Sequence, residues 1–296
     1  MSLLTRLTPR FFVWVVRVLS AALAGCMALA INEAGHTRSS AAGPVAITAW
    51  AALVGVVIVS EVALGSLGLT LVRVLLPAAI PAALVALAVG SQPLWGIVSA
   101  TGALLATLAA FSPETAEAFV QAAAYGDERR LPLRAPATTL LPMGVTWVLW
   151  CAAALGAVLL LGARQWLAGG ALSVAAGGLS WLLVSRCKPF ATRWLVLVPA
   201  GVVIHDSVVL GETLMVHRAN IAWARLAESD TAAADLTGPA AGHLVEIGVI
   251  EMVLAVMAGT RAQPKGAALH VQSLLVAPSR PGQALLALAA AKVPVG

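Results

Sequence analysis

The feature that most constrains the fold is a series of long apolar stretches with almost no charge. A helix needs about 20 apolar residues to cross the roughly 30 Å of hydrocarbon in a bilayer. Only 10% of all residues are charged, against about 25% in a soluble protein. We therefore expect an α-helical integral membrane protein, with six transmembrane helices in residues 1–193. The expected spans are about 11–31, 45–66, 73–90, 93–111, 140–161 and 166–185.

The division of residues 45–90 is the least certain part of this assignment, because they are almost continuously apolar. Gly65 and Gly68 suggest a tight turn, and Arg73 favours a break before the third span. Pro77 and Pro81 are the one hint that this span is a broken helix.

Basic residues give the expected orientation. Short loops rich in Lys and Arg stay on the cytoplasmic side of a membrane. With six spans, Arg38 and Arg164 fall on one side. Nine basic residues fall on the other: Arg6, Arg10, Arg73, Arg129, Arg130, Arg134, Arg186, Lys188 and Arg193. The sequence thus predicts a multi-pass protein of the bacterial plasma membrane with both termini in the cytoplasm.

The main cytoplasmic loop is expected at residues 112–139. Ser112 suits the N-cap of a short helix, with Pro113 in its first turn, and Gly126 ends that helix. We expect this helix to lie along the inner membrane surface. Anionic lipid head groups are the expected partner of the basic cluster. The loop then acts as a simple topology anchor, and the alternative is a docking surface for the C-terminal domain or for a partner. The cluster comprises Arg129, Arg130, Arg134, Arg186, Lys188 and Arg193.

Ionisable residues inside the spans are candidates for function, because a charge in hydrocarbon costs roughly 2–3 kcal/mol on insertion scales. Glu61 lies late in the second span and Arg17 two turns into the first. We expect Glu61 to lie near the inner surface and to pair with Arg17 or Arg73. The alternative is a coupling site of a small transporter or channel.

Small residues at helical spacing predict a packing surface in the sixth span. Gly169, Ser173 and Gly177 are four residues apart, which lets helix backbones approach closely. Tryptophans, including Trp50 and Trp150, are expected to anchor span ends at the membrane interface.

Residues 194–296 are expected to form a small β-rich α+β domain on the cytoplasmic side. The segment "RWLVLVPAGVVIHD" is typical of a β-hairpin, because a Pro-Ala-Gly turn separates two apolar runs. A closing helix is expected after Pro281. Residues 244–259 contain Glu246 and Glu251, which favours strands over a seventh span; a helix remains the alternative.

Several strands followed by one C-terminal helix resemble a pleckstrin-homology-like (PH-like) domain. "WLVLVPAGVVIHD" directly after a span, together with "AYGDERRLPLR" in the loop, resembles actinobacterial polytopic membrane proteins with such a cytoplasmic domain. The resemblance covers the C-terminal third and one loop. It implies a fold and a location, and no site residue follows from it.

Motifs of catalysis and cofactor binding were sought. The sequence has no phosphate-binding loop, dinucleotide fingerprint or nucleophile elbow, and no cofactor, metal site or catalytic residue is expected. The C-terminal part holds 6 Lys+Arg and 7 Asp+Glu, which argues against nucleic acid. We therefore expect a non-enzymatic protein whose module binds a cytoplasmic protein partner or lipid head groups. The alternatives are a transporter or channel that uses Glu61, and a membrane-embedded lipid-modifying enzyme.

Overall fold

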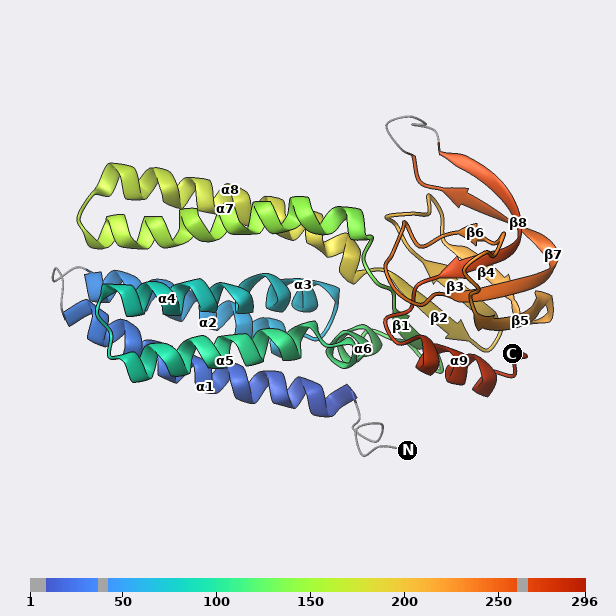
Figure 1. The fold of residues 1–296 in the computed structure, drawn as a ribbon, viewed down its shortest axis with the longest axis horizontal. Helices are drawn as coiled ribbons and strands as arrows, with labels where there is room; N and C mark the ends of the chain where they lie inside the picture. The colour runs from blue at the N-terminus through green and yellow to red at the C-terminus, as the bar shows by residue number, and fades with distance from the viewer. Residues whose placement is uncertain (1–8, 37–41, 260–265) are drawn as a thin grey trace. The chain divides into compact units, whose positions relative to one another are not determined.

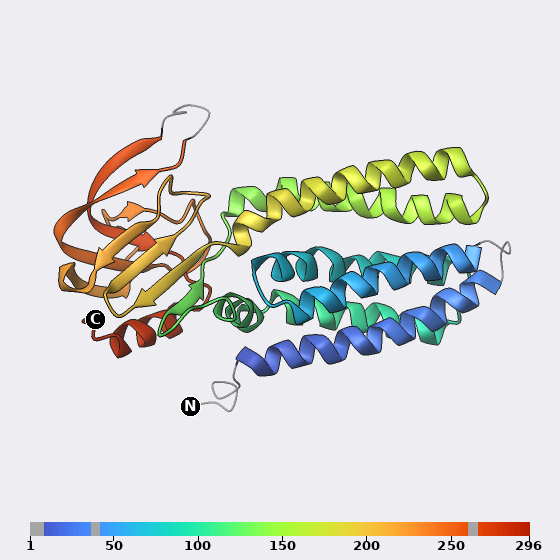
Figure 2. The ribbon, with the colours of Figure 1, turned by 180° about the vertical axis from the view of Figure 1, so that it is seen from behind.

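The structure, a computed structural model, describes residues 9–36, 42–259 and 266–296 (Figures 1 and 2). The chain divides into two compact units. The helical unit comprises Met1–Phe119 and Pro142–Cys187, and the β unit comprises Val120–Leu141 and Lys188–Gly296. Each unit is therefore built from two separate segments of the chain.

Six apolar helices are long enough to cross a membrane in the described residues, which confirms the expected number. The third is interrupted by a 3₁₀ turn, η2, and is labelled in two parts. The helices are α1 (Pro9–His36), α2 (Ala42–Val62), α3 (Ser66–Leu75) with η2 (Leu76–Ala78) and α4 (Ala79–Val89), α5 (Pro93–Phe111), α7 (Ala137–Gly162) and α8 (Trp166–Ala191).

Two helix boundaries differ from the expectation. The third helix starts at Ser66, so Arg73 lies two turns inside it and does not mark its beginning. The 3₁₀ turn contains Pro77, which lacks the N–H that a regular α-helix needs at this position. Helix α8 continues to Ala191, because polar residues near a helix end can extend beyond the hydrocarbon without breaking the helix.

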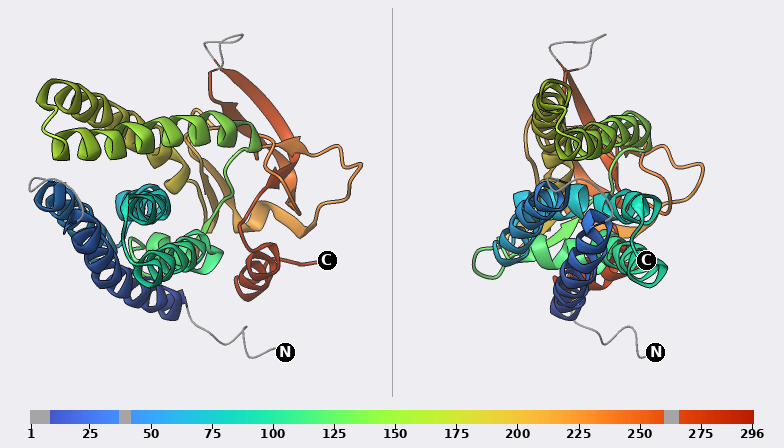
Figure 3. Two further views of the ribbon diagram at one scale, coloured as in Figure 1. Left: turned by 60° about the vertical axis from the view of Figure 1, so that its left-hand side comes forward. Right: turned by 90° about the vertical axis from the view of Figure 1, so that its left-hand side faces the viewer.

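Within the helical unit, α7 and α8 run side by side as an antiparallel pair (Figures 1 and 3). Glycines allow close contacts at three points. A Cβ on Gly156 would lie 2.9 Å from the Leu172 side chain, and one on Gly169 would lie 2.7 Å from Leu161. In the same way Gly96 of α5 receives Leu87 of α4.

Helix α6 (Pro113–Gln121) follows α5 with the predicted cap. The Ser112 hydroxyl accepts a hydrogen bond from the Thr115 backbone N–H at 3.2 Å. The acidic Glu114 lies in the first turn, where the helix dipole favours negative charge. These observations confirm the start of the short loop helix.

The β unit contains two four-stranded sheets, ordered β1-β2-β3-β4 and β5-β7-β8-β6. The hairpin predicted around Pro199 is present as β2 and β3, and residues 244–259 form a strand. Strand β1 comes from the loop before α7 and pairs antiparallel with β2. The strands are β1 (Arg129–Pro132), β2 (Trp194–Val198), β3 (Gly201–His205), β4 (Leu214–His217), β5 (Ile221–Leu226), β6 (Ala234–Asp235), β7 (Val245–Met257) and β8 (Ala267–Val276).

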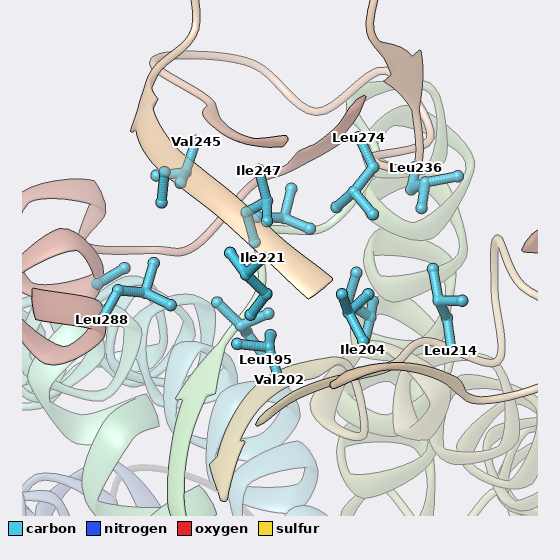
Figure 4. Packing of buried hydrophobic residues seen from close by; sticks show 14 of the residues in the cluster. Leu195, Val202, Ile204, Leu214, Ile221, Leu236, Val245, Ile247, Leu274 and Leu288 are labelled. Atoms are coloured by element: carbon cyan, nitrogen blue, oxygen red, sulfur yellow. The ribbon is translucent and has the colours of Figure 1, made fainter. Parts of the chain in front are cut away.

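One apolar core joins the two sheets and the closing helix α9 (Pro281–Ala290). In Figure 4, Leu195 and Ile204 of the first sheet point toward Ile247 and Leu274 of the second. Leu288 of α9 belongs to the same core and is fully buried. At about 1.5–3 kcal/mol for each buried aliphatic side chain, this continuous core is a main source of the stability of the β unit.

Candidate functional site

The carboxylate of Glu61 is buried between α1 and α2, with 4% of the residue exposed. The Ser20 hydroxyl donates to its Oε1 at 2.6 Å, and the Arg17 guanidinium donates to the Glu61 backbone oxygen at 2.6 Å. Arg17 also lies over the Trp14 ring. The Arg17 guanidinium thus hydrogen-bonds to the main chain of Glu61, and Ser20, which was not predicted as a partner, donates to one carboxylate oxygen.

Arg73 has other partners. Its Nε donates to the carbonyl of Ala110 at 3.1 Å, and its guanidinium lies over the Phe111 ring. The last carbonyls of a helix lack intrahelical donors, so this contact satisfies the end of α5. Arg73 therefore joins α3 to α5 and is not brought to Glu61.

Only part of the predicted glycine surface in α8 is used for packing. Gly169 contacts Leu161 of α7, and the Ser173 hydroxyl donates to the Gly169 carbonyl. A Cβ on Gly177 would meet no described atom within 4 Å.

The basic loop contributes to the β unit through Arg130. Its guanidinium forms an ion pair with Glu128 at 2.6 Å and lies over the Trp194 ring, whose other neighbour is the stacked His205. The backbone N–H of Tyr125, with the Arg130 guanidinium, lowers the pKa of the Glu128 carboxyl. Gln121 accepts from the Arg130 N–H and donates to the Glu128 carbonyl. This arginine therefore holds the loop onto the sheet.

The other basic residues divide into exposed and engaged groups. Arg129, Arg186 and Lys188 are exposed. The Arg134 guanidinium donates to the His243 carbonyl, and burial lowers the pKa of Arg134. Only three of the six basic residues predicted to contact head groups are therefore exposed.

Arg193 was predicted to contact lipid head groups, but its side chain is buried inside the β unit. The side chains of Arg193 and Asp206 are both fully buried and form an ion pair at 2.6 Å. The guanidinium also donates to the carbonyls of Arg134 and Thr237 at 2.7 and 2.8 Å. The second Asp206 oxygen accepts the Val208 N–H at 3.1 Å. With its donors and acceptors satisfied in this way, the pair has a structural role and leaves Arg193 inaccessible to lipid.

A groove of about 530 Å³ lies where the pairing of β7 and β8 is irregular. The register shifts between Gly248 and Val253 of β7, and such bulges redirect side chains next to binding sites. Trp223 of β5 lies across Gly248, where an added Cβ would be 2.4 Å from the indole. His270, Gln272 and Ser273 of β8 add polar groups to the lining.

Arg225 lies beside this groove and forms ion pairs with two carboxylates. Arg225 lies over the Trp223 ring, 4.5 Å from its centroid. Its guanidinium contacts Glu246 at 3.3 Å and Glu228 at 3.4 Å. Glu246 also accepts the Thr231 hydroxyl. The groove therefore presents an aromatic ring and polar side chains, and the neighbouring Arg225 is balanced by two carboxylates.

The edge of β8 next to the groove is only partly covered. Strand β6 pairs with Leu274 and Leu275 alone. Among the described residues, no strand pairs with 267–273 of β8 on the side opposite β7. By contrast, the C-terminal tail covers β5, because the Ala224 N–H donates to the Pro294 carbonyl. Exposed apolar side chains lie on the two paired strands: Ile250, Met252 and Leu254 on β7 and Leu269 on β8.

The described part of the chain has no group of three or more His, Cys, Asp or Glu side chains that could hold a metal ion. Comparisons with protein-family models, curated proteins and solved structures find no match to the chain. The groove and the open edge of β8 could not be found from the sequence, because both depend on a shift in strand register. The one signal for the groove was Gly248 inside a strand, which is typical of a bulge.

Proposed function

We propose that this is a non-enzymatic multi-pass protein of the bacterial plasma membrane whose β unit binds an extended peptide segment of a cytoplasmic protein partner. The observation that carries the proposal is the open edge of β8 beside the Trp223 groove. An extended peptide can add a strand to such an edge, while a neighbouring pocket receives one of its side chains.

The membrane part of the proposal is supported by the six long apolar helices and by the excess of basic residues on one predicted side. A PH-like fold is supported by four consecutive antiparallel strands, β1 to β4, and by β5, β7 and β8 with the closing helix α9. The contribution of β1 from before α7 departs from a contiguous domain.

At the two sheets, where the groove lies, the state of the charges favours a protein partner over lipid head groups, whereas the exposed Arg129, Arg186 and Lys188 lie outside the groove lining. Phosphate recognition needs available Arg or Lys side chains. Arg225 is paired with two carboxylates, Arg130 with one, and Arg193 is buried. The exposed apolar side chains near β8 instead suit a peptide with alternating apolar residues.

The transporter alternative depends on Glu61. Its carboxylate accepts a hydrogen bond from Ser20, and its main-chain oxygen accepts one from Arg17. This arrangement favours a structural role that joins α1 and α2, and leaves the open edge of β8 as the better candidate for function.

The proposal is tested by site-specific photocrosslinking in cells, with benzoylphenylalanine replacing Gln272 in the full chain. A protein adduct is expected at this position and should be lost when Trp223→Ala is added. The matched control places the crosslinker at Met215, which is exposed on β4 of the other sheet, and should give no such adduct. A lipid adduct at position 272, or a protein adduct indifferent to Trp223, would refute the proposal.

Orientation is tested separately. A reporter fused after Gly296 should be shielded from reagents that do not enter intact cells. Accessibility from outside would overturn the cytoplasmic location of the β unit.

A further inference from the structure

We infer that the helical unit binds one acyl chain of a membrane phospholipid in a cavity between α7 and the helices α1, α2 and α4. The inference goes beyond partner binding by the β unit and rests on the proposed insertion of the six helices. The cavity is partly open and has a volume of about 440 Å³. This is about three times the roughly 150 Å³ of a protein cavity that takes up benzene.

Two contacts hold α7 against the other helices and leave the cavity between them. Near the middle of α7, the Trp147 indole N–H donates to the Val74 carbonyl at 2.9 Å. At its C-terminal end, a Cβ on Gly162 would lie 3.0 Å from the Cα of Ala42. The helices are thus close at these two points and separated along the turns between them.

The lining matches hydrocarbon. Most of its side chains are Ala, Val, Leu or Ile. The polar atoms of its two indoles are used elsewhere, because Trp50 donates to the Ala24 carbonyl and Trp150 to the Ser180 hydroxyl. Both tryptophans are buried, which corrects their expected place at the membrane interface. The cavity thus offers an apolar chain dispersion contacts along its length.

The length of the cavity fits one leaflet. On α2 the lining runs from Ala42 to Leu53, and on η2 and α4 together it runs from Ala78 to Val89. At 1.5 Å per residue each stretch covers roughly 17 Å, close to the roughly 15 Å of one leaflet's hydrocarbon. Ala42 and Val89 are terminal residues of their helices, so the cavity extends from one end of the helices toward their middle.

The contacts at the two ends of the cavity decide between possible occupants. A helix from a second copy has a diameter of about 10 Å. It would have to enter between α7 and the other helices, which are already in contact at Trp147 and at Gly162. A single acyl chain is slender enough, and phospholipid is the bulk component that surrounds helices in a bilayer.

The test uses the full chain in vesicles of phosphatidylcholine that carries a diazirine near the middle of one acyl chain. After irradiation, the labelled peptides are mapped by mass spectrometry. Label should be concentrated on the lining, at residues such as Ala46, Ala82 and Ala154, relative to the exposed Leu167 and Val174 of α8.

Matched variants test occupancy directly. The double substitution Ala82→Leu and Ala154→Leu fills the cavity and should abolish this concentration of label. The control, Ala88→Leu and Ala152→Leu, makes the same changes at exposed positions of the same two helices and should retain it. If the variant with the filled cavity does not fold, the distribution of label in the unsubstituted protein still tests the proposal.

Three other results would each contradict a different part of the proposal. Label only on outward-facing residues such as Leu167 would refute the acyl-chain site while supporting insertion. No label anywhere in the helices would refute insertion itself. Stronger competition by unlabelled polyprenyl phosphate than by unlabelled phosphatidylcholine would overturn the assignment to phospholipid.

Discussion

The two units bury apolar surface in different ways. The β unit has one continuous core, in which both sheets and α9 meet. The helical unit has smaller clusters among its described residues. One lies around Met27 and Trp50 and another around Trp150 and Leu183, and members of both line the cavity of about 440 Å³.

A closed core in one unit and a cavity in the other are what the physics of burial favours in water and in lipid, respectively. In water, every exposed apolar area is unfavourable, so a soluble domain closes its core. Between membrane helices this driving force is absent, because lipid tails are as apolar as the side chains. A gap that would destabilise the β unit is therefore compatible with the proposed membrane location of the helical unit, where lipid would fill it.

The largest expected effect concerns where the β unit begins. A fragment of residues 194–296 lacks β1, whose Leu131 is 3% exposed, and lacks Arg193, the buried partner of Asp206. It should be largely unfolded by circular dichroism. A chain that joins residues 120–136 through a flexible linker to residues 188–296 should give a β-rich spectrum. A stable β-rich 194–296 fragment would show that β1 and Arg193 are dispensable.

The next effect concerns the buried ion pair. Asp206→Ala leaves the Arg193 guanidinium buried without its counter-charge, which costs about 3–5 kcal/mol. Urea-dependent proteolysis of the detergent-solubilised chain measures this loss. The double variant Arg193→Met with Asp206→Leu should be less destabilised than Asp206→Ala, since no lone charge remains buried. Equal destabilisation of the two variants would contradict this account.

The comparison between units is tested most directly by the same substitution in each. Ala224→Leu adds volume to the closed β core, where Ala224 is fully buried, and should cost about 1–3 kcal/mol. Ala154→Leu adds the same volume to the cavity and should change stability by no more than about 0.5 kcal/mol. Both are measured by thermal unfolding in the same detergent. Equal losses would mean that the cavity is not available space.

The smallest effect concerns Glu128 on the surface of the β unit. Its carboxyl has a lowered pKa in the folded state, first because of the Tyr125 N–H and then because of Arg130. A lowered folded pKa stabilises the protein above the unfolded pKa of about 4.3 and loses this contribution as the pH falls through the folded pKa. The stability difference from Glu128→Gln should therefore be present at pH 7 and shrink in acid. Glu212→Gln, at an exposed carboxylate, is the control.

Periodicity and turn residues were enough to predict much of the fold. Uninterrupted apolar runs indicated the six helices, and Pro-Ala-Gly between two apolar runs indicated the β2–β3 hairpin. These signals are local, so they do not depend on what the rest of the chain does. Strand β1 was missed because it has only four residues and ends in Pro132, which is unfavourable in most strands.

The role of Arg193 could have been found from the same hairpin. Trp194 pairs with His205 across β2 and β3, so the preceding Arg193 and the following Asp206 lie opposite each other at its open end. Charge counting assigned Arg193 to the membrane surface because it treats every arginine near a span as exposed. The Trp223 groove and the cavity depend on register and packing between distant segments, and no local pattern encodes them.

Helices α7 and α8 lie between β1 and β2 in the sequence, so β1 is synthesised well before the strand with which it pairs. Residues 133–193 separate the two strands, and at roughly 5–20 residues per second this interval lasts several seconds. During that time β1 has emerged without the neighbour against which it folds. Under the proposed membrane insertion, the β unit can therefore be completed only after α7 and α8 have been synthesised and inserted, and β1 stays unpaired until then.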